Sequence, residues 1–125
     1  MRLLLDTHIY LWAVSADALL SPESRRLIES ADAVYVSAAS IWEIVIKVRL
    51  GKIAADPDAL VAAVESSGFL HLPISAAHAA GVAGLPPHHN DPFDRLLVSQ
   101  AVTEPLRLLT ADALLVKYGA MVVPV

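Results

Sequence analysis

Four acidic residues lie where a carboxylate is unusual unless it takes part in chemistry. Asp6 and Asp112 each come soon after an apolar run that is typical of a buried strand. Asp94 shares a helical face with the apolar residues three, four and seven positions further on, and Glu43 lies inside an apolar stretch. Carboxylates that gather in one pocket repel each other and need a cation. We therefore expect these four acids to bind a metal ion if the fold brings them together.

The chemistry of such a site follows from its donor atoms. The chain has no cysteine, so these candidate ligands are all oxygens. Oxygen ligands suit Mg²⁺ or Mn²⁺, and such an ion can activate a water and stabilise the charge that develops on a phosphodiester. Thr7 and Thr110 stand close to the two strand-end acids and are candidate donors that hold carboxylates or waters in place.

Each acid also has a structural explanation, and the sequence leaves both readings open. Asp6 can cap the helix that follows it. Glu43 can form an ion pair with Lys47, four residues further along a helix. Asp94 can complete a capping box that begins at Asp91, and Asp91 could equally be the ligand in its place.

Histidines and basic residues supply further candidates. His88 and His89 are adjacent on a proline-rich loop, a spacing that does not predict a zinc site, and we expect them to line the rim of the acidic site. Candidate contacts for a polyanionic substrate are Lys47, Arg49 and Arg95. A solvated helix face explains the first two as well, and Arg95 can instead pair with Asp91.

The elements that must position these residues alternate between strands and helices. Strands are expected near residues 2–5, 34–36, 69–72, 106–109 and 121–123, with helices near 9–14, 22–31, 39–50, 57–68, 91–103 and 110–117 and a small Ala-rich helix capped by Ser75. This alternation predicts a single α/β domain over residues 1–125, with a central parallel sheet of about five strands covered by helices on both faces. If the first and fourth strands are neighbours, Asp6 and Asp112 meet at the carboxyl ends of the strands, where such sheets bind ligands.

Composition narrows the class of protein. Hydrophobic residues make up 56% of the 125 residues, but no apolar run approaches the ~18 residues that cross a bilayer. We expect no signal peptide, no membrane segment and a cytoplasmic location. The net charge of −4 gives no general basic character, so any nucleic-acid binding must depend on local basic residues and on metal ions.

In this order and spacing, the motifs resemble the PIN-domain ribonucleases, especially the toxins of VapBC-type toxin–antitoxin pairs. The matching segments are Leu3-Leu4-Leu5-Asp6-Thr7-His8, Ser40-Ile41-Trp42-Glu43-Ile44, His89-Asn90-Asp91-Pro92-Phe93-Asp94-Arg95-Leu96-Leu97 and Leu109-Thr110-Ala111-Asp112. The resemblance spans essentially the whole chain, and His8 departs from it because many members have Asn or Ser there.

The resemblance implies a PIN-like fold and an activity. Asp6, Glu43, Asp94 and Asp112 fall on the family's catalytic, metal-binding acids, and Thr110 falls on its small polar helper. The implied activity is Mg²⁺-dependent endonucleolytic cleavage of RNA, blocked by a small antitoxin protein, and members commonly form homodimers.

Three alternatives remain at this point. A receiver-like signalling domain also uses an acidic pocket, but it needs paired acids after the first strand, where this chain has Asp6 alone. An Asp-nucleophile phosphatase that uses Asp6 needs a second Asp where His8 stands. A PIN scaffold that has lost catalysis and binds only a partner is the third.

Overall fold

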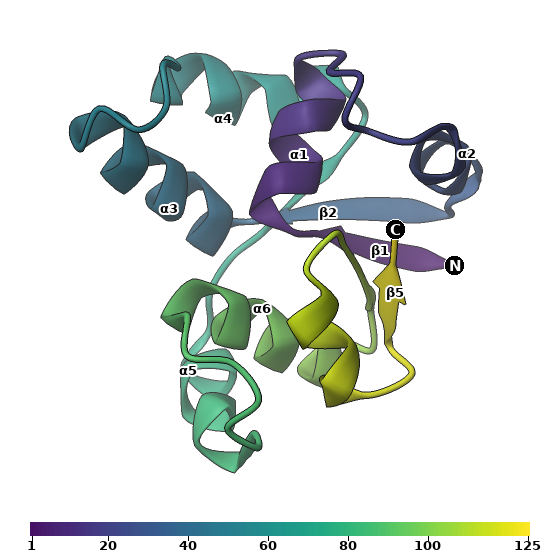
Figure 1. Cartoon of the computed structure of the whole chain (residues 1–125), viewed down its shortest axis with the longest axis vertical. Helices are drawn as coiled ribbons and strands as arrows, with labels where there is room; N and C mark the ends of the chain where they lie inside the picture. The colour runs from purple at the N-terminus through teal and green to yellow at the C-terminus, as the bar shows by residue number, and fades with distance from the viewer.

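The computed structural model describes residues 1–125 as a five-stranded parallel sheet with helices on both faces (Figure 1). The strands are β1 (Arg2–Leu5), β2 (Ala33–Ser37), β3 (Leu70–Leu72), β4 (Arg107–Thr110) and β5 (Val122–Pro124). The helices are α1 (Thr7–Val14), α2 (Pro22–Ser30), α3 (Ala38–Arg49), α4 (Pro57–Ser66), α5 (Ala76–Gly81) and α6 (Pro92–Thr103), with short 3₁₀ helices η1 (Val82–Gly84) and η2 (Ala113–Tyr118). The predicted fold class is confirmed.

Two helix starts differ by two or more residues from the sequence-based expectation, because an aspartate caps each of these helices. The first helix begins at Thr7 rather than two residues later, since Asp6 accepts a hydrogen bond from an N–H of the first turn. The last helix begins at Ala113 and is a 3₁₀ helix, since Asp112 caps it, and Thr110 belongs instead to β4.

The strand order brings the ends of β1 and β4 side by side. The order across the sheet is β3-β2-β1-β4-β5, so β1 is central. Leu5 at the end of β1 pairs with Leu109 of β4. Because the strands are parallel, the segments that carry Asp6 and Asp112 leave the sheet at the same edge. The condition set above, that the first and fourth strands are neighbours, is met.

Alternate residues of β1 divide the core into two layers. Leu3 and Leu5 pack with α1, α3 and α4 on one face, and Leu4 packs with α6 and η2 on the other (Figure 1). All three side chains have no exposed surface, and burying each contributes roughly 1.5–3 kcal/mol. The rigid central strand therefore fixes where Asp6 lies.

Candidate metal centre and active site

Asp6 directly follows β1, and its side chain is hydrogen-bonded to both α1 and β4. Its Oδ1 accepts a hydrogen bond from the Ile9 N–H of α1 at 2.9 Å, and its Oδ2 accepts one from the Thr110 hydroxyl of β4. The Thr110 hydroxyl oxygen in turn accepts a hydrogen bond from the Asp112 backbone N–H at 3.0 Å. Thr110 thus links the two strand-end acids, and Asp6 itself is only 5% exposed.

Glu43 reaches the same region from α3 and is 7% exposed. Its Oε1 accepts a hydrogen bond from the Thr7 hydroxyl at 2.6 Å, and Thr7 Oγ1 lies 3.0 Å from Ser40 Oγ. The other carboxylate oxygen, Oε2, lies 2.9 Å from Lys47 Nζ. The ion pair considered as the structural explanation is therefore present, yet the second oxygen of Glu43 is held against α1 by Thr7.

Asp91 and Asp94 occupy the N-terminal turn of α6. Asp91 is the N-cap, and its Oδ1 accepts hydrogen bonds from the N–H groups of Phe93 and Asp94 at 2.9 and 3.0 Å. The Asp91 N–H donates to His89 Nδ1 at 3.0 Å, so it is not available to the Asp94 side chain. The capping box considered for Asp94 is therefore wrong. Asp94 is directed at His89 instead, with 3.4 Å between Oδ2 and Nε2.

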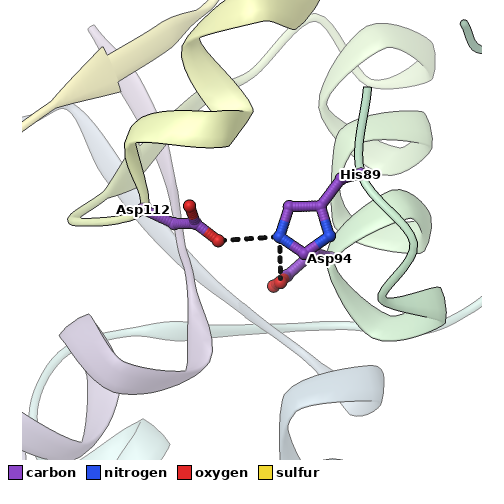
Figure 2. Close-up of side chains that lie close together, drawn as sticks. All are labelled: His89, Asp94 and Asp112. Carbon is purple, nitrogen blue, oxygen red and sulfur yellow. Dashed lines mark hydrogen bonds and ion pairs between the residues drawn. The ribbon is translucent and has the colours of Figure 1, made fainter. Parts of the chain in front are cut away.

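His89 bridges two acids from different elements (Figure 2). Its Nε2 lies 2.8 Å from Oδ2 of Asp112 and 3.4 Å from Oδ2 of Asp94. Because Nδ1 accepts the hydrogen bond from Asp91, we assign the imidazole proton to Nε2, which donates it to Asp112. A protonated nitrogen has no free lone pair for a metal, so in this arrangement His89 positions Asp112 instead of acting as a ligand.

Asp6, Glu43, Asp91 and Asp94 lie close enough to influence one another electrostatically. The pKa of Asp94 is raised to about 7, first by burial and then by the carboxylates of Asp91 and Glu43. His89 acts in the opposite direction, and Asp6 adds a smaller repulsion. Burial also raises the pKa of Asp6, and Glu43 contributes to that shift. One bound cation can hold such mutually repelling carboxylates in their charged forms.

The donor set therefore fits a hard divalent cation. Asp6 and Asp112 line one cavity of about 300 Å³. One carboxylate oxygen of Asp94 and one of Asp112 lie within 4.8 Å of each other. Oxygen ligands are the ones that Mg²⁺ and Mn²⁺ prefer, so the carboxylates of Asp6, Glu43, Asp94 and Asp112 are the candidate ligands. An acidic site of this kind can support metal-assisted hydrolysis.

The candidate substrate-binding residues differ in what they contact. Lys47 is engaged with Glu43, and Arg49 is exposed at the end of α3. The Arg95 guanidinium donates to the Tyr118 hydroxyl and to four backbone carbonyls, those of Val82, Leu85, Pro86 and His89. The expected pair between Arg95 and Asp91 is therefore wrong, because Arg95 braces the loop that precedes α6. A contact between Arg95 and substrate stays a prediction.

Sequence reasoning missed the contacts of two residues. It placed His89 with His88 on the rim, whereas His88 is exposed against Tyr118 and His89 is directed between two carboxylates. Ser40, buried beside Thr7, was not singled out either. A signal for Ser40 existed, because a polar residue three positions before Glu43 lies on the same helical face. No comparable signal existed for His89, whose position depends on the fold of the loop.

Comparison with known proteins gives a family and a fold. The family model described as PIN domain matches residues 3–120. No curated protein sequence matches the chain. The structure also contains no helix with the length and apolarity required to cross a membrane.

Three of the solved structures that share this fold illustrate the similarity. VapBC2 from Rickettsia felis, bound to a DNA fragment from its promoter, superposes with a TM-score of 0.73 at 15% identity, covering 99% of this chain and 98% of the other. A toxin–antitoxin complex from Klebsiella pneumoniae gives 0.68 at 20% identity, with coverages of 96% and 94%. FitAcB from Neisseria gonorrhoeae gives 0.58 at 19% identity, with coverages of 90% and 89%.

Proposed function

The chain belongs to the PIN-domain family, and from this premise we propose that it is a metal-dependent endoribonuclease that acts as the toxin of a type II toxin–antitoxin pair. The family supports a nuclease. The toxin role is supported by the structural neighbours, two of which are described as VapBC2 and as a toxin–antitoxin complex. The proposed cofactor is Mg²⁺ or Mn²⁺, and the proposed substrate is RNA.

The observation that carries the nuclease proposal is the convergence of acids from four separate elements. Asp6 follows β1, Glu43 lies on α3, Asp94 lies on α6, and Asp112 follows β4. The pKa of Asp94 is raised first by burial, then by the carboxylates of Asp91 and Glu43, and to a smaller extent by Asp6, which supports a shared environment for three of the four acids. Buried like charges are costly to keep unless they serve a site, so this convergence favours metal-binding catalytic acids over structural caps.

The bound ion would supply a water of lowered pKa and would stabilise the charge that develops on the phosphodiester. The chain's own residues would hold the acids in place. Thr110 orients Asp6, Thr7 orients Glu43, and His89 orients Asp112. These donors fix one oxygen of each acid, which limits how far the carboxylates can rotate away from an ion.

We propose a small antitoxin protein as partner, with an apolar segment that binds beside α1. An apolar groove of about 570 Å³ separates α1 from α4 and the segment before it. Leu11 and Trp12 line it on one side, and Ala59 and Ala63 line it on the other. The neighbouring Tyr10 does not contribute to this groove, because its ring is fully buried and its hydroxyl donates a hydrogen bond to the Leu60 carbonyl. A homodimer is proposed from the family resemblance alone.

The receiver-like signalling domain and the Asp-nucleophile phosphatase fit the structure less well. A receiver-like sheet has the order 2-1-3-4-5, which places its third strand beside the first, whereas here β3 is at the edge. Residue His8, where an Asp-nucleophile phosphatase needs its second acid, is exposed. The remaining rival is a PIN scaffold without catalysis, and experiment must separate it from the nuclease.

A cleavage assay separates them. Purified protein is incubated with a panel of labelled RNAs in Mg²⁺ or Mn²⁺, with and without chelator, beside the variant Asp6→Asn. The proposal expects cleavage that the chelator abolishes and that Asp6→Asn loses while its circular dichroism spectrum is unchanged. Cleavage that survives both the chelator and the substitution would refute the proposed site, and no cleavage of any RNA would favour the inactive scaffold.

A further inference from the structure

A small cavity beside the acidic cluster has one acidic wall and one aromatic wall. Its lining consists of Asp6, Asp112, Ala111 and the side chains of His8 and Trp12 from α1. The volume of about 300 Å³ is at the lower end of the roughly 300–1,000 Å³ that small-molecule pockets occupy. The cavity thus suits one ring-sized group, and two of the proposed catalytic acids face it.

The aromatic wall is built by two residues one helical turn apart. The His8 and Trp12 rings lie with centroids 6.0 Å apart at a tilt of 44°, so neither ring covers the face of the other. His8 is exposed, and Trp12 is half-buried because it also packs against the core. Aromatic side chains that remain accessible beside a nucleic-acid site commonly stack on unpaired bases, since every base has a π-face.

We propose that Trp12, with His8 beside it, stacks on the nucleobase next to the phosphodiester that is cut. The inference rests on the proposed nuclease function and adds a positioning residue to it. A base held in this cavity would place its own sugar and phosphate at the edge formed by Asp6 and Asp112. The metal and the acids recognise the backbone, whereas the aromatic wall recognises the base and fixes the register of the strand.

The same two residues connect this cavity to the proposed partner site. His8 and Trp12 also line the apolar groove between α1 and α4. A protein segment seated in that groove would contact the aromatic wall of the base pocket.

The two tryptophans of the chain allow a direct binding test. The variant Trp42→Phe leaves Trp12 as the sole tryptophan, and Trp12→Phe leaves Trp42, which is 58% exposed and contacts Phe93. Each is titrated in Mg²⁺ with hexaadenylate RNA and with the matched hexamer whose residues are abasic. Stacking predicts quenching of Trp12 emission by hexaadenylate and much less by the abasic strand. A sole Trp12 whose emission is unchanged by hexaadenylate overturns the proposal.

Steady-state cleavage of an oligoribonucleotide supplies the second test. Trp12→Ala is expected to raise KM about 5- to 150-fold, the range given by the loss of one stacked base, with a smaller effect on kcat. Trp12→Phe should restore most of the affinity because it keeps a stacking face. His8→Ala should also raise KM. Because His8 is exposed, this variant should fold and keeps the test possible even if Trp12→Ala does not fold.

The outcomes separate this inference from the nuclease proposal. If the parent cuts RNA but both alanine variants keep its KM, the base pocket is wrong and the nuclease stands. If the parent cuts nothing yet sole-Trp12 protein is quenched by hexaadenylate and not by the abasic strand, the pocket stands and the nuclease proposal fails.

Discussion

The substitution Asp94→Asn should stabilise the folded protein above pH 7 when no divalent cation is present. The pKa of Asp94 is raised from its ordinary value of 3.8 to about 7, mainly by burial and by the nearby carboxylates of Asp91 and Glu43. The folded state therefore holds the Asp94 proton more tightly than the unfolded state does. The contribution of the Asp94 carboxyl to the free energy of unfolding is fully present below pH 3.8 and is lost as the pH rises through 7. Asparagine keeps the shape of the side chain and cannot ionise.

The size of the effect follows from the pKa shift. Raising the pKa of Asp94 from 3.8 to about 7, at ~1.36 kcal/mol for each pKa unit, gives ~4 kcal/mol as an upper limit. The Asp94 side chain is 20% exposed, which lets water screen part of the repulsion, so we expect about 2–4 kcal/mol at pH 8. At pH 4 the variant and the parent should differ by much less, because the parent carboxyl is then protonated when folded.

Urea unfolding followed by circular dichroism at pH 4, 6 and 8 in chelator measures this difference. Asp58→Asn is the matched control, because Asp58 is an exposed aspartate in the first turn of α4 and shares the helix-dipole contribution of ~0.3–1 kcal/mol. Millimolar Mg²⁺ should stabilise the parent and the control but not Asp94→Asn. An Asp94→Asn protein that is less stable than the parent at pH 8 in chelator would contradict the crowded-acid account.

Three further predictions test other parts of the structure. Thr110→Val removes a donor to Asp6 and an acceptor for a backbone N–H, so it should lower the free energy of unfolding by about 1–3 kcal/mol in urea and weaken Mn²⁺ binding about 10- to 100-fold by calorimetry. Gly81→Ala places a Cβ 2.6 Å from Ser99 Oγ and should cost about 1–3 kcal/mol, and adding Ser99→Ala should recover part of that loss; no loss in the single variant would contradict the packing. Ala59→Arg fills the apolar groove at an exposed helix position, so it should keep RNA cleavage but prevent a coexpressed cognate antitoxin from relieving growth arrest.

Periodicity and capping signals were enough to predict the fold class. The unbroken apolar run before Asp6 predicts a strand buried on both faces, and its leucines are fully buried in the centre of the sheet. Ser21-Pro22 and Asp91-Pro92 each predict a helix start, and α2 and α6 begin there. Both kinds of signal depend only on residues that are neighbours in the chain, so they predict the local structure without knowledge of the tertiary contacts.

Contacts that depend on tertiary structure were harder to predict. His89 contacts Asp112, 23 residues further on, and the loop that carries His89 is held by hydrogen bonds from Arg95 to its backbone carbonyls. The spacing of these residues in the sequence does not predict the conformation of that loop. The structural roles of Asp6 and Glu43 are present, because Asp6 caps α1 and Glu43 pairs with Lys47, whereas their metal-binding roles stay predictions. A carboxylate has two oxygens, so a structural bond does not exclude a functional one.

The claim that folding gathers carboxylates around one divalent cation is tested most directly by calorimetric titration of Mn²⁺ into the parent, Asp6→Asn and Asp58→Asn. The account predicts saturable binding to the parent and to the exposed control Asp58→Asn, and at least ~10-fold weaker binding to Asp6→Asn. Equal affinity for all three proteins, or no binding to the parent at millimolar Mn²⁺, would contradict it.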